Sequence, residues 1–169
     1  MTSEEITLLT VYNNRGQSIL RSELLAWKDT VTGSDIFGPV IQHTWQVNGQ
    51  TYERLNPRND GLYILPDASG FLLRENVERT DNLLLLDAYG AERMRLDVPV
   101  HMTGATHPDS FKYPTGFIGL TTPYPNPATG EDGKFGVKAY VEGFHGQAFY
   151  FELNYHTGEF LWCYRLQRE

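Results

Sequence analysis

The fold class is decided by residues 82–96, whose sequence is Asn82-Leu83-Leu84-Leu85-Leu86-Asp87-Ala88-Tyr89-Gly90-Ala91-Glu92-Arg93-Met94-Arg95-Leu96. A run of leucines leads into Asp-Ala-Tyr-Gly, and a second segment follows that ends at Leu96. Asp and Gly provide the local hydrogen bonds and the positive φ angles that a tight hairpin turn requires. The stretch therefore predicts two antiparallel β-strands joined by a turn, and the leucine run predicts a buried strand.

The same pattern of apolar segment, turn residues, glycine and second segment occurs at three further places along the chain. These are residues 6–21, 62–74 and 147–166. Repeated hairpins of this kind are typical of an all-β, mainly antiparallel domain. Because such sheets avoid exposed edges by closing or by packing face to face, we expect a meander of hairpins that forms a barrel or a two-sheet sandwich, with at most one or two short helices.

Three segments depart from this pattern. Residues 20–27 have some apolar positions at helical spacing, although a strand is favoured, and residues 75–86 contain acids that a helical turn could use. Residues 98–134 hold six of the nine prolines. Proline lacks the amide that a central strand donates, so this region is predicted to be loop or sheet edge, where binding surfaces are often found.

The composition indicates one globular domain spanning residues 1–169, with 40% hydrophobic and 13% aromatic residues. At this length the chain buries enough surface to fold without disulfides, which agrees with its single cysteine, Cys163. No apolar run is long enough for a membrane span, so no membrane partner is expected. The N-terminus is acidic where a secretory signal would be basic, and this predicts a cytoplasmic protein.

The formal net charge is −7, from 21 acidic and 14 basic residues. Such a charge repels phosphate backbones, which makes nucleic acid a poor partner, and it attracts basic proteins. The simpler explanation is that the charge keeps a small domain soluble. The two interpretations stay open on the sequence alone.

Residues that could carry chemistry are few. His101, His107 and Asp109 lie close together in the sequence, but their spacing matches no standard zinc pattern. We therefore predict no metal and no cofactor. Cys163 alternates with Trp162 and Tyr164, as a core cysteine in a strand would. Because no motif combines a nucleophile, a base and a charge stabiliser, an enzyme is the least favoured class.

Aromatic residues are abundant enough to suggest a binding surface as well as a core. Trp27 and Trp162 lie among aliphatic neighbours, so both are interpreted as core residues. For exposed aromatic contacts the proline-rich region is favoured, and its candidates are Tyr113, Phe117 and Tyr124.

A short acidic β-domain with Asp-x-x-Gly hairpins, as at Asp87–Gly90, and without a catalytic motif resembles bacterial immunity proteins. The resemblance implies a stoichiometric inhibitor that docks on a cognate toxin in the cytoplasm. An acidic inhibitor would be steered onto a basic toxin. The residues predicted to contact this partner are Asp109, Tyr113, Phe117, Tyr124, Glu131 and Asp132.

The sequence is also compatible with two other functions. The main alternative is a β-barrel that binds a small molecule or a carbohydrate in its interior. The other is an accessory domain of a larger assembly. Neither alternative predicts particular residues.

Overall fold

The computed structural model describes residues 4–23, 37–104, 114–142, 144 and 147–167. These residues form twelve β-strands in three four-stranded sheets, and neighbouring strands pair antiparallel. Helical structure within the described part is confined to 3-10 turns at residues 21–23 and Val100–Met102. The all-β prediction is confirmed.

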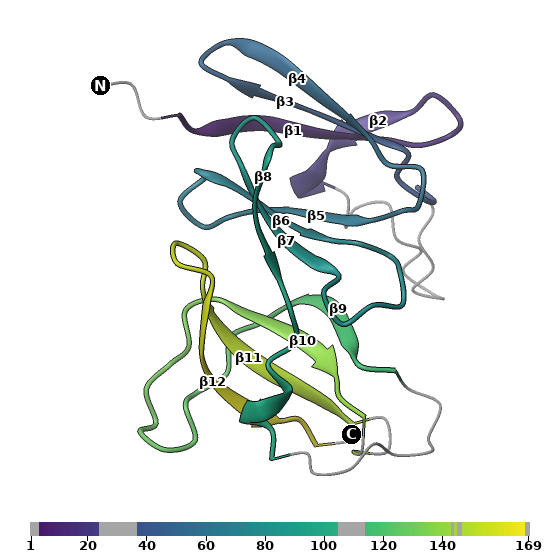
Figure 1. Ribbon diagram of the computed structural model, residues 1–169. Coiled ribbons are helices and arrows are strands. Elements are labelled where there is room, and N and C mark those ends of the chain that lie inside the picture. Colours follow the sequence, from purple (N-terminus) through teal and green to yellow (C-terminus); the bar gives the residue numbers. More distant parts are fainter. Residues whose placement is uncertain (1–3, 24–36, 105–113, 143, 145–146, 168–169) are drawn as a thin grey trace.

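The three sheets are stacked in the order in which the chain forms them (Figure 1). The N-terminal sheet has the order β2 (Ser18–Leu20), β1 (Ile6–Tyr12), β3 (Gln42–Val47) and β4 (Gln50–Leu55). The central sheet has the order β5 (Gly61–Ile64), β6 (Gly70–Arg74), β7 (Leu83–Asp87) and β8 (Glu92–Leu96). The C-terminal sheet has the order β12 (Glu159–Arg165), β11 (Ala148–Asn154), β10 (Gly136–Tyr140) and β9 (Gly116–Thr121).

The four hairpins predicted from the sequence are present as β1–β2, β5–β6, β7–β8 and β11–β12. The β7–β8 turn shows why the prediction succeeds. The Asp87 carboxylate accepts hydrogen bonds from the main-chain N–H groups of Tyr89 and Ala91, at 2.9 and 3.0 Å. Gly90 has a φ of +84°, which a side chain would disfavour. All of these interactions are local, so the sequence of the turn is enough to form it.

The central sheet is buried on both faces. Side chains alternate along a strand, so Leu83 and Leu85 of β7 enter the core shared with the C-terminal sheet. Leu84 and Leu86 point the other way and pack in the core shared with the N-terminal sheet. A sheet covered on both sides needs strands that are apolar throughout, which is what the leucine run provides.

The sheets stay open and packed face to face, without closing into a barrel. Of the two arrangements expected from the sequence, the sandwich is the one found, with three layers in place of two. The third layer follows from the central strands, because a two-layer sandwich would leave one apolar face of β6 and β7 in water.

The three ambiguous segments take different forms. Residues 18–20 are a strand and residues 21–23 a 3-10 turn, while residues 24–27, including Trp27, lie outside the described residues. Residues 75–82 form bends and turns that lead into β7, with no helix there. Within residues 98–134, β9 lies at the edge of the C-terminal sheet, and residues 105–113 are outside the described part.

Candidate functional site

The structure separates the six predicted contact residues into three groups. Asp109 and Tyr113 lie outside the described residues. Phe117 is in β9, and Tyr124, Glu131 and Asp132 lie in the loop that joins β9 to β10, residues 122–135. We call this segment the hairpin loop.

Phe117 is a core residue, so its predicted role in partner contact is corrected. Its exposed fraction is 1%, and its ring packs between the central and C-terminal sheets. Its main-chain N–H donates to Asn82 Oδ1 at 2.8 Å, and its carbonyl accepts from Arg74 and Asn82. The prediction took residues 98–134 as loop or sheet edge, and β9 is an edge strand, but its pairing with β10 points one of its faces inward.

The hairpin loop is closed by its own main-chain hydrogen bonds. The N–H of Asn126 donates to Glu131 O at 2.8 Å, and the N–H of Gly133 donates to Tyr124 O at 3.0 Å. Gly130, with a φ of +76°, donates back to Asn126 O and makes the reversal at the tip. The loop is therefore a small ordered hairpin in its own right.

A buried carboxylate attaches the hairpin loop to the sheet beneath it. Glu152 of β11 is 5% exposed, and its side chain accepts hydrogen bonds from Lys134 N–H at 2.7 Å and from the Tyr150 hydroxyl. Burial first, and then the bond to Glu152, raise the pKa of Tyr150 well above its ordinary value, so the phenol stays a proton donor. A Cβ at Gly133 would lie 2.6 Å from Glu152 Oε1, so this close approach requires glycine.

Four aromatic side chains gather on the outer face of the C-terminal sheet, and we call them the aromatic face: Tyr124, Tyr150, Trp162 and Tyr164. Ring centroids are 5.3 Å apart for Tyr124 and Tyr150, 6.0 Å for Tyr124 and Tyr164, and 5.1 Å for Tyr150 and Trp162. Tyr150 is buried beneath the others, which are half-buried.

The position of Trp162 differs from the sequence interpretation. Cys163 packs against the core, and its thiol donates to Met102 O at 3.3 Å. Because side chains alternate, its neighbours Trp162 and Tyr164 point to the outer face. The signal was present in the sequence, since a core cysteine between two aromatics places both aromatics on the opposite side. Tyr124 was predicted as an anchor for a partner, and it also anchors the hairpin loop to Tyr150.

Glu131 and Asp132 are exposed, and neither forms an ion pair with any residue that the structure describes. Lys138 points to the same outer face as the four aromatic side chains, because it alternates with the core residue Val137, and Lys134 is an exposed residue of the hairpin loop. The acids at the tip of the hairpin loop are therefore unpaired among the described residues, although lysines lie on the same part of the molecule.

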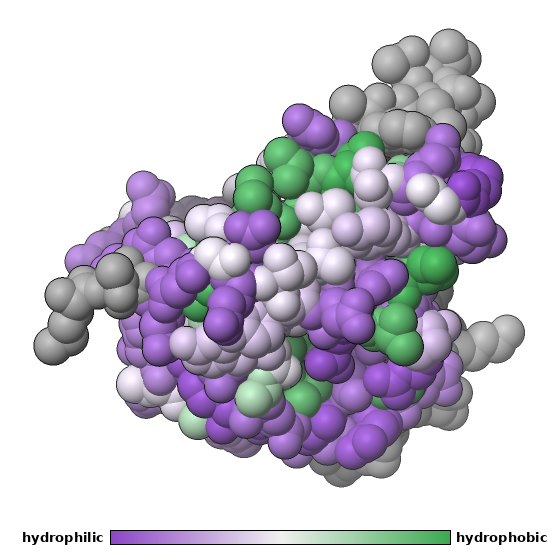
Figure 2. All heavy atoms as spheres, turned by 90° about the horizontal axis from the view of Figure 1, so that it is seen from above, coloured by the Kyte–Doolittle hydropathy of each residue, from purple (hydrophilic) through white to green (hydrophobic). Residues whose placement is uncertain are grey.

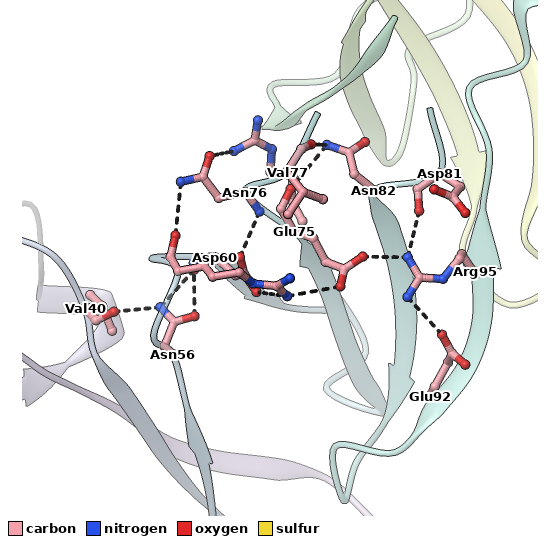
Figure 3. Close-up of polar contacts among 12 residues, drawn as sticks. Val40, Asn56, Asp60, Glu75, Asn76, Val77, Asp81, Asn82, Glu92 and Arg95 are labelled. Atoms are coloured by element: carbon pink, nitrogen blue, oxygen red, sulfur yellow. Dashed lines mark hydrogen bonds and ion pairs between the residues drawn. The ribbon is translucent and has the colours of Figure 1, made fainter. Parts of the chain in front are cut away.

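A second polar cluster, at one edge of the central sheet, contrasts with this loop (Figure 3). Glu75 accepts from Arg58 at 3.2 Å and from Arg95 at 2.5 Å, and Arg58 also pairs with Asp60 at 3.1 Å. Partial burial raises the pKa of Glu75, but Arg95 and Arg58 outweigh it and hold the pKa below its ordinary value. These acids are neutralised by the protein's own arginines, and Asp60 also fixes the main chain at Asn76.

Two surface cavities of about 410 Å³ lie near the N-terminal sheet. One is mainly apolar and is lined by residues that include Leu8, Leu20 and Leu120. The other is polar and is lined by residues that include Arg21 and His43.

The structure leaves the predicted histidine cluster incomplete. His101 is exposed on the 3-10 turn, while His107 and Asp109 are outside the described residues. Within the described ranges, no group of three or more His, Cys, Asp or Glu side chains is placed to hold a metal ion. None of the helical turns in that part of the chain has the length and apolar character needed to cross a bilayer.

Comparison with known proteins gives a likeness of fold. No protein-family model matches the chain, and no curated protein matches its sequence. A chain in the solved structure of Tne2 in complex with Tni2 is similar, with a TM-score of 0.67 and 13% sequence identity. The match covers 96% of this chain and 99% of that chain. The two chains therefore share their overall fold.

Proposed function

We propose that this protein is a non-enzymatic, protein-binding inhibitor, an immunity protein that neutralises a cognate toxin in the cytoplasm by docking on it. The observation that carries the proposal is the likeness over nearly the full length to a chain solved in a complex of two proteins. A rigid sandwich with an ordered, half-exposed aromatic surface is well suited to such a contact.

The charge of the chain supports a basic toxin as the partner. At a net charge of −7, long-range attraction would speed encounter with a cationic surface and disfavour nucleic acid. One inhibitor molecule would bind and block one toxin molecule, and the inhibitor would make or break no covalent bond.

The test uses the product of the neighbouring gene as the toxin. Co-expression is expected to rescue growth, and the two purified proteins are expected to elute together in size-exclusion chromatography. In a titration, toxin activity should fall linearly and vanish near one equivalent of inhibitor. Protection at amounts far below one equivalent would indicate catalysis, and either that result or the lack of a complex would overturn the proposal.

A thermal-shift screen separates this function from small-molecule or carbohydrate binding. A partner that binds the native state but not the unfolded state raises the midpoint of thermal unfolding when it is added. The toxin is expected to raise the midpoint, whereas sugars and small acids are expected to leave it unchanged. A shift with a small ligand and none with the toxin would favour the alternative.

A further inference from the structure

We infer that the docking surface is the aromatic face together with the tip of the hairpin loop, and that its occupant is a cationic segment of the toxin. The inference rests on the proposed function and adds the place of contact and the chemistry of the partner.

The aromatic side chains have the properties of interface anchors. Tyr124, Trp162 and Tyr164 are half-buried, so each keeps part of its ring accessible while its neighbours hold it in place. Ordering a flexible side chain on binding loses conformational entropy, and this loss is smaller for rings that are already held in place. Tyr and Trp are also the residue types most enriched among side chains that dominate binding energy.

The hairpin loop places negative charge beside these rings. Glu131 and Asp132 are exposed and form no ion pair with a described residue, and Asp132 lies opposite Pro125, next to Tyr124. The loop that carries them is fixed by Glu152 and by its own hydrogen bonds, so the two carboxylates are positioned before the partner arrives. Lys or Arg side chains of a partner would complete the missing pairs at the rim of the aromatic face.

Three other surfaces of the described part differ from it in chemistry. The acids at the edge of the central sheet are already neutralised by Arg58 and Arg95 (Figure 3). The outer face of the N-terminal sheet carries threonines and glutamines, including Thr10, Thr44 and Gln46. On the side of the molecule seen in Figure 2, hydrophobic residues form separate groups with polar residues between them.

Charge reversal with a matched control tests the contact with the acids. Glu131→Lys/Asp132→Lys is compared with Glu53→Lys/Glu78→Lys, which changes the net charge equally at exposed acids elsewhere. The loop pair is expected to weaken toxin binding by about 30-fold or more, the loss typical of interface residues that dominate affinity. The control pair should weaken it by less than about 5-fold, because only long-range steering is reduced. Equal losses would overturn the assignment of the surface.

Alanine substitutions at Tyr124 and Trp162 test the aromatic side chains, with the thermal midpoint as a check on folding. Each is expected to weaken binding by about 10-fold or more. A second measurement does not depend on variants. Hydrogen exchange of the wild-type complex should show new protection at residues 122–135 and 159–165.

The outcomes separate the two proposals. If the wild-type protein binds no toxin, the proposed function fails. If it binds and protection instead appears on β1, β3 and β4, the function stands and the inferred surface is wrong. If the aromatic face binds a single-stranded oligonucleotide more tightly than the toxin, the cationic protein is not its occupant.

Discussion

At the scale of single residues, His43 is the clearest case of a side chain whose chemistry is set by its surroundings. It points inward from β3, its exposed fraction is 3%, and Nδ1 has no hydrogen-bond partner within the described residues. Burial, and then the positive charges of Arg21 and Arg54, lower its pKa to about 4. The folded protein therefore holds His43 neutral, while the unfolded chain protonates it near its ordinary pKa of 6.5.

This difference in pKa makes stability depend on pH. Above pH 6.5 His43 is neutral in both states, and as the pH falls toward 4 only the unfolded state gains a proton. Between pH 7 and pH 5 the wild-type protein is expected to lose about 2 kcal/mol of unfolding free energy through this residue. His43→Leu should remove that part of the loss in urea titrations at the two pH values. Val47→Ala, at a buried position of the same strand that carries no titratable group, is the control and should lower the free energy of unfolding by the same amount at both pH values.

At the scale of elements, local sequence was sufficient to predict the turns of hairpins, but it was not sufficient to predict which other strands and sheets they pack against. Asp87 and Gly90 specify their turn through bonds within a few residues, so the hairpin of β7 and β8 could be predicted. Phe117 could not be placed, because prolines and glycines on both sides of it conceal a short strand that exists only by pairing with β10. Trp162 could have been placed, because alternation puts it on the opposite face of β12 from the core residue Cys163.

The pairing of β6 with β7 leaves no room for a side chain at the start of β6. Gly70 is buried, and a Cβ there would lie 2.2 Å from the main-chain oxygen of Leu86. Gly70→Ala is expected to lower the free energy of unfolding by about 2–3 kcal/mol, because the strands must separate locally. The measurement is a urea titration beside Gly130→Ala, where nothing lies within 4 Å of the added Cβ. The control variant is expected to lose only about 1 kcal/mol of unfolding free energy, because alanine is disfavoured at a positive φ. Equal losses in the two variants would contradict the steric explanation.

At the scale of the whole molecule, the central sheet joins two cores. Trp45 packs in the core shared with the N-terminal sheet, and Cys163 packs against the core shared with the C-terminal sheet. Removing either outer sheet would expose one apolar face of β6 and β7, at a cost of roughly 25 cal/mol for each Å². The three layers are therefore coupled through the sheet between them.

Coupling of this kind predicts a single unfolding transition. In the variant Trp27→Phe/Trp162→Phe, Trp45 fluorescence reports one core and the reaction of Cys163 with a thiol reagent reports the other. The two probes are expected to give the same urea midpoint, as a two-state transition requires. Midpoints that differ beyond experimental error would mean that an outer sheet unfolds by itself.

The candidate site was also predicted only in part from the sequence. The sequence placed Tyr124, Glu131 and Asp132 in one loop region, and the structure keeps them together in the hairpin loop. The sequence could not show that Tyr124 lies on Tyr150, or that Glu152 holds the loop, because those contacts join residues 26 and 18 positions apart in the chain.

The sequence by itself determined the strands and turns of four hairpins and the buried character of the leucine run, because alternation and turn chemistry act over a few neighbouring residues. Only the tertiary structure decided that three sheets stack and that Phe117 points inward. Alternation shows that a strand has two faces, but which face is covered depends on sheets formed elsewhere in the chain. The surface available to a partner is fixed by that choice.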